Sequence, residues 1–151
     1  MKTRIIGLGN TILTDDGVGV YAVREAATRL AAGRPDIDVV ETEAAGFALL
    51  ELMEGFERVV LVDSIAFDNT APGTIVRIAP DDLRTSLRLR SIHEIDLPTA
   101  LGLGKAMGFK MPEDVRIVAI QGEDMLTVGE TMTATLRAAM PALVDAVVAE
   151  A

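Results

Sequence analysis

The sequence predicts an α/β fold, a three-layer α/β/α sandwich around a mainly parallel, twisted sheet of about five strands. Short apolar runs rich in Ile and Val alternate along the chain with longer stretches of helical period. Several of the short runs are apolar at consecutive positions, as in strands that helices cover on both faces. The 151 residues contain no repeat, linker or low-complexity tract, so we expect a single domain over 1–151.

The strands are expected where the Ile- and Val-rich runs lie, at Arg4–Leu8, Asp38–Glu41, Val59–Val62, Thr74–Ile78 and Val115–Ile120. The segment 68–73, DNTAPG, has the composition of a turn. It is too short to hold a crossover helix, which a parallel connection usually needs. The fourth strand is therefore expected to pair antiparallel, at or near an edge of the sheet.

The helices are expected near Gly17–Ala31, Phe47–Glu54, from about Asp96 onward, and at Glu130–Glu150. Asp15 or Asp16 stands where it could cap the first helix, and Asp96 is a plausible N-cap of the third. Pro98 is compatible with that third helix because proline is tolerated in a first turn.

The composition excludes several classes of function. Lys and Arg number 14 against 23 Asp and Glu, a formal charge of −9, which argues against nucleic acids and anionic membranes as partners. Cysteine is absent, so disulfides, thiolate metal sites and cysteine nucleophiles are excluded. No apolar run is long enough for a membrane span and no signal-peptide pattern opens the chain, so we expect a cytoplasmic protein.

The stretch RIIGLGNTILTDDGVG, Arg4–Gly19, begins like the phosphate-binding turn of a dinucleotide enzyme. The third glycine of that fingerprint would fall on Ile12, whose β-branched side chain prevents close helix–strand packing. Asp15 and Asp16 would also place negative charge beside a pyrophosphate. Glu41 or Glu43 could still act as the ribose-binding acid, so nucleotide binding stays as an alternative.

A second interpretation takes this stretch as a loop that presents a carboxylate. Gly7 and Gly9 would bend the backbone so that Asp16 points inward, and the side chain of Asn10 would bond local backbone in the same turn. Ligands of parallel sheets bind at the carboxyl ends of the strands, and Asp63 ends the third strand.

The chain has one histidine, His93, in the loop between the fourth strand and the third helix. Two carboxylates, Asp16 and Asp63, and this imidazole are a plausible ligand set for a divalent metal. Each residue also has a purely structural alternative: a helix cap for Asp15 or Asp16, a turn for Asp63, and packing for His93. For Asp15 we favour the cap.

With these residues assembled, the chain resembles the hydrogenase maturation endopeptidases over nearly its whole length. These proteases trim the C-terminus of the large subunit of nickel–iron hydrogenases. The resemblance is carried by four blocks in order: GLGNTILTDDGVG, VVLVDSIAFDNTAPGT at Val59–Thr74, SIHEIDLPTAL at Ser91–Leu101, and VRIVAIQGED at Val115–Asp124.

The resemblance implies that Asp16, Asp63 and His93 contact the metal. For the cleavage of the peptide bond, the metal could polarise the scissile carbonyl or lower the pKa of a bound water, or Asp16 or Asp63 could instead act as general base. The family has Glu or Asp at the first of these positions, and Asp is shorter by one methylene. In ETEAAGF, Glu41–Phe47, the family often has a glycine-rich run that is thought to help recognise the substrate. This chain offers only Gly46 there.

The resemblance further implies that nickel arrives in the hydrogenase large-subunit precursor, bound by the thiolates of that subunit. Asp, Asp and His form a weak nickel site, which suffices if the protein only completes the coordination of a metal that its substrate presents. Other divalent metals could occupy the same ligands. We expect a nickel-dependent endopeptidase and a monomer, and the alternative is a non-catalytic binding module, either nucleotide-binding or a chaperone of the hydrogenase subunit.

Overall fold

The fold was analysed in a computed structural model, which describes residues 1–44, 46–80 and 97–151. The expected strands are confirmed, each with ends within a few residues of those predicted. In chain order the elements are β1 (Thr3–Leu8), the 3₁₀ helix η1 (Thr14–Gly17), α1 (Val18–Leu30), β2 (Ile37–Thr42), α2 (Phe47–Met53), β3 (Arg58–Ile65), β4 (Ile75–Ile78), α4 (Leu97–Ala106), β5 (Asp114–Gln121) and α5 (Ala134–Glu150).

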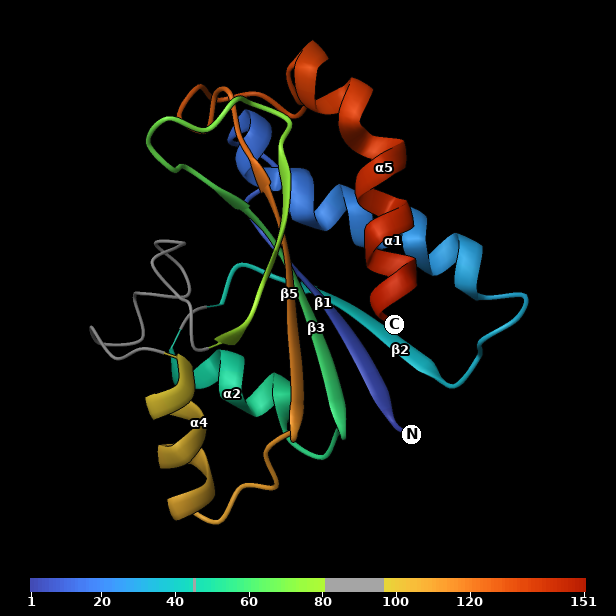
Figure 1. Cartoon of the computed structure of the whole chain (residues 1–151), viewed down its shortest axis with the longest axis vertical. Helices are drawn as coiled ribbons and strands as arrows, with labels where there is room; N and C mark the ends of the chain where they lie inside the picture. The colour runs from blue at the N-terminus through green and yellow to red at the C-terminus, as the bar shows by residue number, and fades with distance from the viewer. Residues whose placement is uncertain (45, 81–96) are drawn as a thin grey trace.

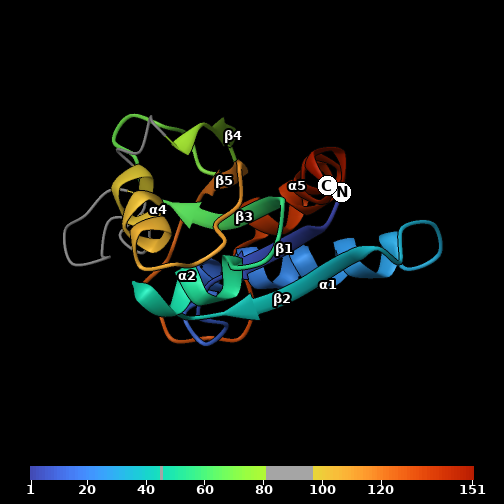
Figure 2. The same cartoon turned by 90° about the horizontal axis from the view of Figure 1, so that it is seen from below.

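The strands form one sheet in the order β2-β1-β3-β5-β4, in which Figure 1 shows the long central strands and Figure 2 labels all of the strands. β1 pairs in parallel with both β2 and β3, and β3 pairs in parallel with β5. β4 pairs antiparallel with β5 and forms one edge, as the short turn before it predicted. The carboxyl ends of β1, β3 and β5 therefore lie side by side at the same end of the strands, which we call the carboxyl edge of the sheet. Ligands bind at this end in folds of this class.

Helices cover both faces of the sheet and complete the predicted three layers (Figures 1 and 2). α1 and α5 pack together on one face, over Ile5, Val60 and Val62. α2 and α4 cover the other face, over Ile6 and Leu61. Side chains alternate between the faces of a strand, so a residue's position in its strand decides which helix pair it meets.

The beginnings of two helices differ from the prediction. α1 begins at Val18 with Gly17 at the N-cap position, because Asp15 and Asp16 belong to the preceding η1 turn. α5 begins at Ala134 rather than near Glu130, with the Thr133 hydroxyl accepting the N–H of Leu136.

The third expected helix is α4, which has Pro98 in its first turn as predicted. Its expected cap, Asp96, lies outside the described residues. Within the described part of the chain, no helix is both long and apolar enough to cross a membrane.

Candidate active site

Two buried carboxylates lie at the edge of the sheet where β1 and β3 end. Asp63 is near the end of β3 and is 1% exposed, and Asp16 is 7% exposed in η1. η1 follows β1, the neighbour of β3, and itself contacts β3. The structure therefore brings the Asp16 and Asp63 segments together at the edge that the sequence predicted.

Asp16 is held by the loop that leads to it. Its Oδ2 accepts the backbone N–H of Asn10 at 3.0 Å. The side-chain Oδ1 of Asn10 accepts the N–H of Ile12 at 3.1 Å, and its backbone carbonyl accepts the N–H of Leu13 at 3.1 Å. The predicted bonding of Asn10 to local backbone is confirmed, and the turn it closes orients the Asp16 carboxylate.

Gly9 is required by the close approach of this loop to η1. A Cβ atom at Gly9 would lie 2.3 Å from the backbone oxygen of Asp16. Gly7 has a different role from the predicted bend, because it lies inside β1 and pairs with Glu41 and Val62. A Cβ at Gly7 would lie 2.4 Å from Cγ2 of Val23, so this glycine lets α1 pack closely on the sheet.

These contacts argue against a nucleotide in the glycine turn. In a dinucleotide site, the missing side chains leave room for the pyrophosphate to approach the backbone. Here the protein's own backbone fills the space beside Gly9. The N–H of Asn10, which could face a phosphate, is bound by the Asp16 carboxylate.

Asp63 lies on the face of the sheet that α2 and α4 cover. It stands two positions from both Leu61 and Ile65 in β3, and these two side chains pack in the core on that face. Its Oδ1 accepts the N–H of Ser64 at 2.8 Å. α4, on this same face, begins soon after His93 in the sequence, but His93 itself lies outside the described residues. Among the residues that the structure does describe, no three His, Cys, Asp or Glu side chains are grouped to hold a metal.

Gln121, which the sequence analysis did not single out, also belongs to this edge. It ends β5, is in register with Ile65 and is 7% exposed. Its Oε1 accepts the N–H of Phe67 at 2.8 Å, which ties the segment after β3 to β5. Since Ala119 pairs with Asp63, Gln121 lies two positions further along the same face. A polar residue ending a strand of apolar residues was the available signal.

Asp15 links two loops instead of capping α1, and it is fully buried. Its Oδ2 accepts the backbone N–H groups of Glu123 and Asp124 at 3.0 and 2.9 Å. Its Oδ1 accepts the N–H of Thr133 at 2.7 Å, and the Thr133 hydroxyl lies 2.9 Å from Oδ2. Several donors thus satisfy the buried carboxylate, as burial requires. The same hydrogen bonds fix Thr133 as the cap of α5, which explains why that helix begins late.

Backbone hydrogen bonds join the same two loops, which we call the paired loops: 10–16 and 122–133. The N–H of Thr14 donates to the carbonyl of Gly129 at 3.0 Å, and the N–H of Gly129 donates to Ile12 at 2.8 Å. The hydroxyl of Tyr21 lies 3.1 and 2.7 Å from the carbonyl oxygens of Thr11 and Glu130. Asp16 is therefore carried by a loop anchored along its length.

Gly46 is the N-cap residue of α2, with ψ −144° and a positive φ of 69° that favours glycine. Its carbonyl accepts the N–H of Leu49 at 3.1 Å. The conformation of this turn thus accounts for the one glycine in the segment that was predicted to contact substrate.

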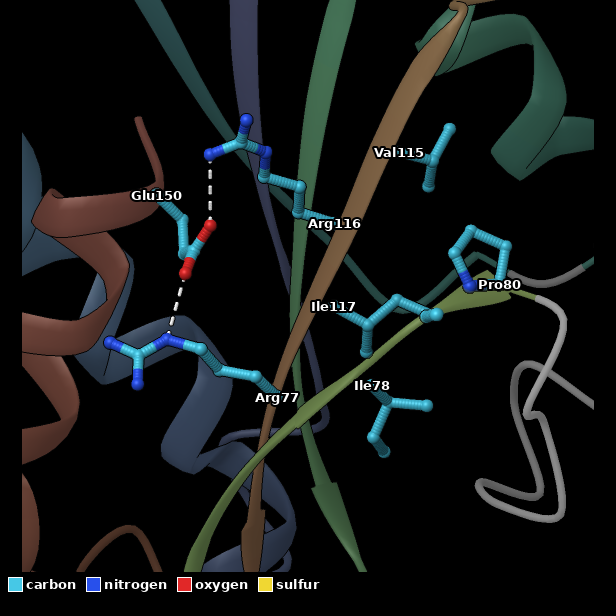
Figure 3. Close-up of a pocket in the computed structure, with 8 residues that line it drawn as sticks. Arg77, Ile78, Pro80, Val115, Arg116, Ile117 and Glu150 are labelled. Carbon is cyan, nitrogen blue, oxygen red and sulfur yellow. Dashed lines mark hydrogen bonds and ion pairs between the residues drawn. The ribbon is translucent and has the colours of Figure 1, made fainter.

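A separate cavity of about 260 Å³ lies at the opposite end of the sheet, between the end of β4 and the beginning of β5. Figure 3 shows Arg77 and Arg116 on either side of Glu150, with N–O distances of 2.7 and 3.0 Å. Both guanidinium groups are thus paired with the carboxylate of α5. The cavity is remote from Asp63, which lies near the carboxyl end of β3.

Comparisons with known proteins agree with this arrangement. The family model "HycI: Hydrogenase maturation protease" matches residues 20–150. The chain is 25% identical over 146 residues to the hydrogenase expression/formation protein HupD of Rhizobium leguminosarum bv. viciae, covering 95% of this chain and 71% of that protein. It is 25% identical over 127 residues to the hydrogenase 2 maturation protease of Escherichia coli K12, covering 83% and 76%.

Solved structures share the fold. The hydrogenase maturating endopeptidase HybD from Escherichia coli superposes with a TM-score of 0.77 at 24% identity, over 99% of this chain and 91% of that one. The [NiFe] hydrogenase maturation protease HybD from Thermococcus kodakarensis gives 0.71 at 22% identity, over 97% and 96%. Because the family model matches most of this chain, the chain belongs to the hydrogenase maturation protease family and is a peptidase.

Proposed function

We propose that this peptidase removes the C-terminal extension of the large-subunit precursor of a nickel–iron hydrogenase, after nickel has been inserted. The observation that supports this most is the pair of buried carboxylates, Asp16 and Asp63, at the carboxyl edge of the sheet. Each accepts a backbone N–H, from Asn10 and Ser64 respectively, which holds it in a fixed orientation. Fixed carboxylates suit both metal contact and proton transfer.

The proposed reaction is hydrolysis of one peptide bond. A water oxygen bonds to the carbonyl carbon, and one carboxylate of the pair takes the proton of that water. The C–N bond then breaks, and the proton passes to the departing amine nitrogen. Asp16, Asp63 and His93 are the side chains that would contact the nickel of the bound precursor. The nickel polarises the reacting carbonyl or water, or serves to recognise a loaded precursor.

Nickel is part of the substrate in this proposal, held by thiolates of the precursor. The chain has no cysteine, so its own ligands are carboxylate and imidazole, which bind nickel more weakly than thiolates do. Weak binding makes the reaction depend on a metal that the precursor presents. The lack of cysteine also fits a reducing compartment, and we place the protein in the cytoplasm as a monomer.

The test is to mix the purified protein with nickel-loaded and nickel-free precursor and to measure loss of a C-terminal peptide by mass spectrometry. We expect cleavage of the loaded precursor only. Asp16→Asn, Asp63→Asn and His93→Gln should each slow it by about 100-fold or more. Asp145→Asn, which changes a 71% exposed carboxylate on α5, is the control. Normal cleavage by the Asp63 variant would contradict the assignment, and binding without cleavage by the wild type would favour the non-catalytic module.

A further inference from the structure

The paired loops carry three large apolar side chains that face solvent: Ile12, Leu126 and Val128, which we call the rim patch. Their exposed fractions are 50%, 88% and 77%. Single exposed apolar residues are ordinary, whereas several on adjoining segments beside a site indicate an interaction surface. Ile12 belongs to the loop that orients Asp16, so the rim patch is continuous with the candidate active site.

Strand-like pairing places two of these side chains on one side of the loops. Leu13 and Gly129 form a parallel β-bridge, with backbone hydrogen bonds on both sides of it. Ile12 and Val128 precede these partners and are therefore in register with each other. Neighbours in register project from the same face of a β ribbon. Leu126 lies within a turn that the Asp124 carboxylate closes by accepting the N–H groups of Leu126 and Thr127.

The rim patch is held in place rather than carried on a free loop. Asp15 accepts hydrogen bonds from both ends of the 122–133 loop, at Glu123 and Thr133. The hydroxyl of Tyr21 holds the same loop on α1 by donating to the carbonyl oxygen of Glu130. A surface already ordered in the free protein loses little conformational entropy when a partner binds, so its apolar area contributes more fully to affinity.

Charge near the rim patch indicates the chemistry of the partner. The loop 122–133 contains Glu123, Asp124 and Glu130, and no Lys or Arg. The loop 10–16 also lacks Lys and Arg, and it adds the carboxylate of Asp16, since that of Asp15 is fully buried. Together with the formal charge of −9, this favours a partner segment that combines apolar and basic side chains.

We propose that the rim patch docks an apolar segment of the hydrogenase large-subunit precursor that carries Lys or Arg side chains. The inference rests on the proposed function, since it names the surface that binds the same substrate. Docking here places the bound chain directly beside the Asp16 loop. Contacts of this kind, remote from the reacting bond and equal in the bound and transition states, lower KM and leave kcat unchanged.

The test compares two double variants in the cleavage assay with nickel-loaded precursor. Leu126→Ser with Val128→Ser removes apolar area from the rim patch and leaves the Asp16 loop intact. Leu103→Ser with Met107→Ser, at 37% and 56% exposure, is the matched control; Leu103 lies on α4 and Met107 directly follows it. We expect KM of the rim variant to rise about tenfold or more with kcat within about twofold, and the control to keep both values. Equal KM for wild type, rim variant and control would overturn the proposal.

Two further measurements test whether basic side chains of the precursor meet the rim patch and whether a second copy of this chain occupies it instead. Glu130→Gln and added NaCl should each raise KM if basic side chains of the precursor meet the rim. Sedimentation velocity tests a second copy as the occupant: a wild-type dimer that the rim variant dissociates, with KM unchanged, would overturn precursor docking. Absence of cleavage by the wild type would contradict the proposed function instead.

Precursor binding by Asp63→Asn, measured with and without the rim substitutions, would still decide whether the rim patch docks the precursor. Loss of binding with the rim substitutions supports docking, and equal binding overturns it.

Discussion

The carboxylate of Asp15 accepts hydrogen bonds from both the backbone N–H and the hydroxyl of Thr133, which is 118 positions away in the sequence. The same hydroxyl caps α5. Asp15 thereby couples the loop that carries Asp16 to the beginning of the last helix. Its neighbour Asp16 is one of the two proposed catalytic residues, so the proposal gives the adjacent aspartates separate roles, Asp15 structural and Asp16 catalytic.

Replacing Asp15 with Asn should destabilise the protein strongly. The amide keeps the shape, but its NH₂ group would face backbone N–H donors that the carboxylate now satisfies. Buried donors left without an acceptor cost about 1–3 kcal/mol each, so we expect a loss of about 3 kcal/mol in the free energy of unfolding. Urea denaturation measures it, with Asp145→Asn as a control that should change stability by less than about 0.5 kcal/mol. An unchanged urea midpoint would show that the donors find other partners.

Two glycine-to-alanine substitutions should act in opposite directions. At Gly9, a Cβ would lie 2.3 Å from the Asp16 backbone oxygen, so η1 must shift. We expect lower stability and a marked loss of cleavage from Gly9→Ala. At Gly102, inside α4, nothing lies within 4 Å of the added atom, so Gly102→Ala should stabilise by up to about 1 kcal/mol. Thermal unfolding and the cleavage assay compare the two, and full activity in Gly9→Ala would contradict the close approach described above.

Gln121 should tolerate Glu better than Leu. Its Oε1 accepts the N–H of Phe67, and Leu would leave that donor without an acceptor. We expect Gln121→Leu to lower the free energy of unfolding by roughly 1–3 kcal/mol, whereas Gln121→Glu keeps an acceptor oxygen. Backbone amide hydrogen exchange at Phe67 gives a local measurement. Protection retained in the Leu variant would argue that the segment after β3 is held by other contacts.

The ion pairs of Asp114 should make part of the stability depend on pH. Burial alone would raise the pKa of this carboxyl, but hydrogen bonds from Arg116 and Arg58 outweigh burial and lower it below the ordinary value. A pKa that is lower in the folded state contributes stability above the unfolded value of about 3.9, and that stability is lost as the pH falls through the folded pKa.

We therefore expect Asp114→Asn to be about 1 kcal/mol less stable than the wild type at pH 7, with the deficit shrinking below about pH 4. Urea denaturation at pH 7 and pH 3 measures it. A deficit of equal size at both values would assign the effect to packing rather than to charge.

The sequence by itself determined the layers of the fold and the position of the Asp16 and Asp63 segments at the carboxyl ends of the strands. Apolar runs predicted each strand of the described residues, and the short DNTAPG turn predicted the antiparallel edge strand β4. These features could be predicted because strand periodicity and turn composition are local properties of the chain. The motif blocks likewise indicated the protease family that the comparisons show. The metal-contacting role of Asp16, Asp63 and His93 stays a prediction.

Only the tertiary structure decided what Asp15, Gly7 and Gln121 do. From the local pattern, Asp15 looked like a helix cap and Gly7 like a bend. In the folded chain, Asp15 binds a loop more than a hundred residues away, and Gly7 makes room for the side chain of Val23. A buried carboxylate is hydrogen-bonded by the donors that the fold places beside it, and a glycine is required where other atoms closely approach its Cα. Both depend on contacts between distant segments, which no local pattern of residues contains.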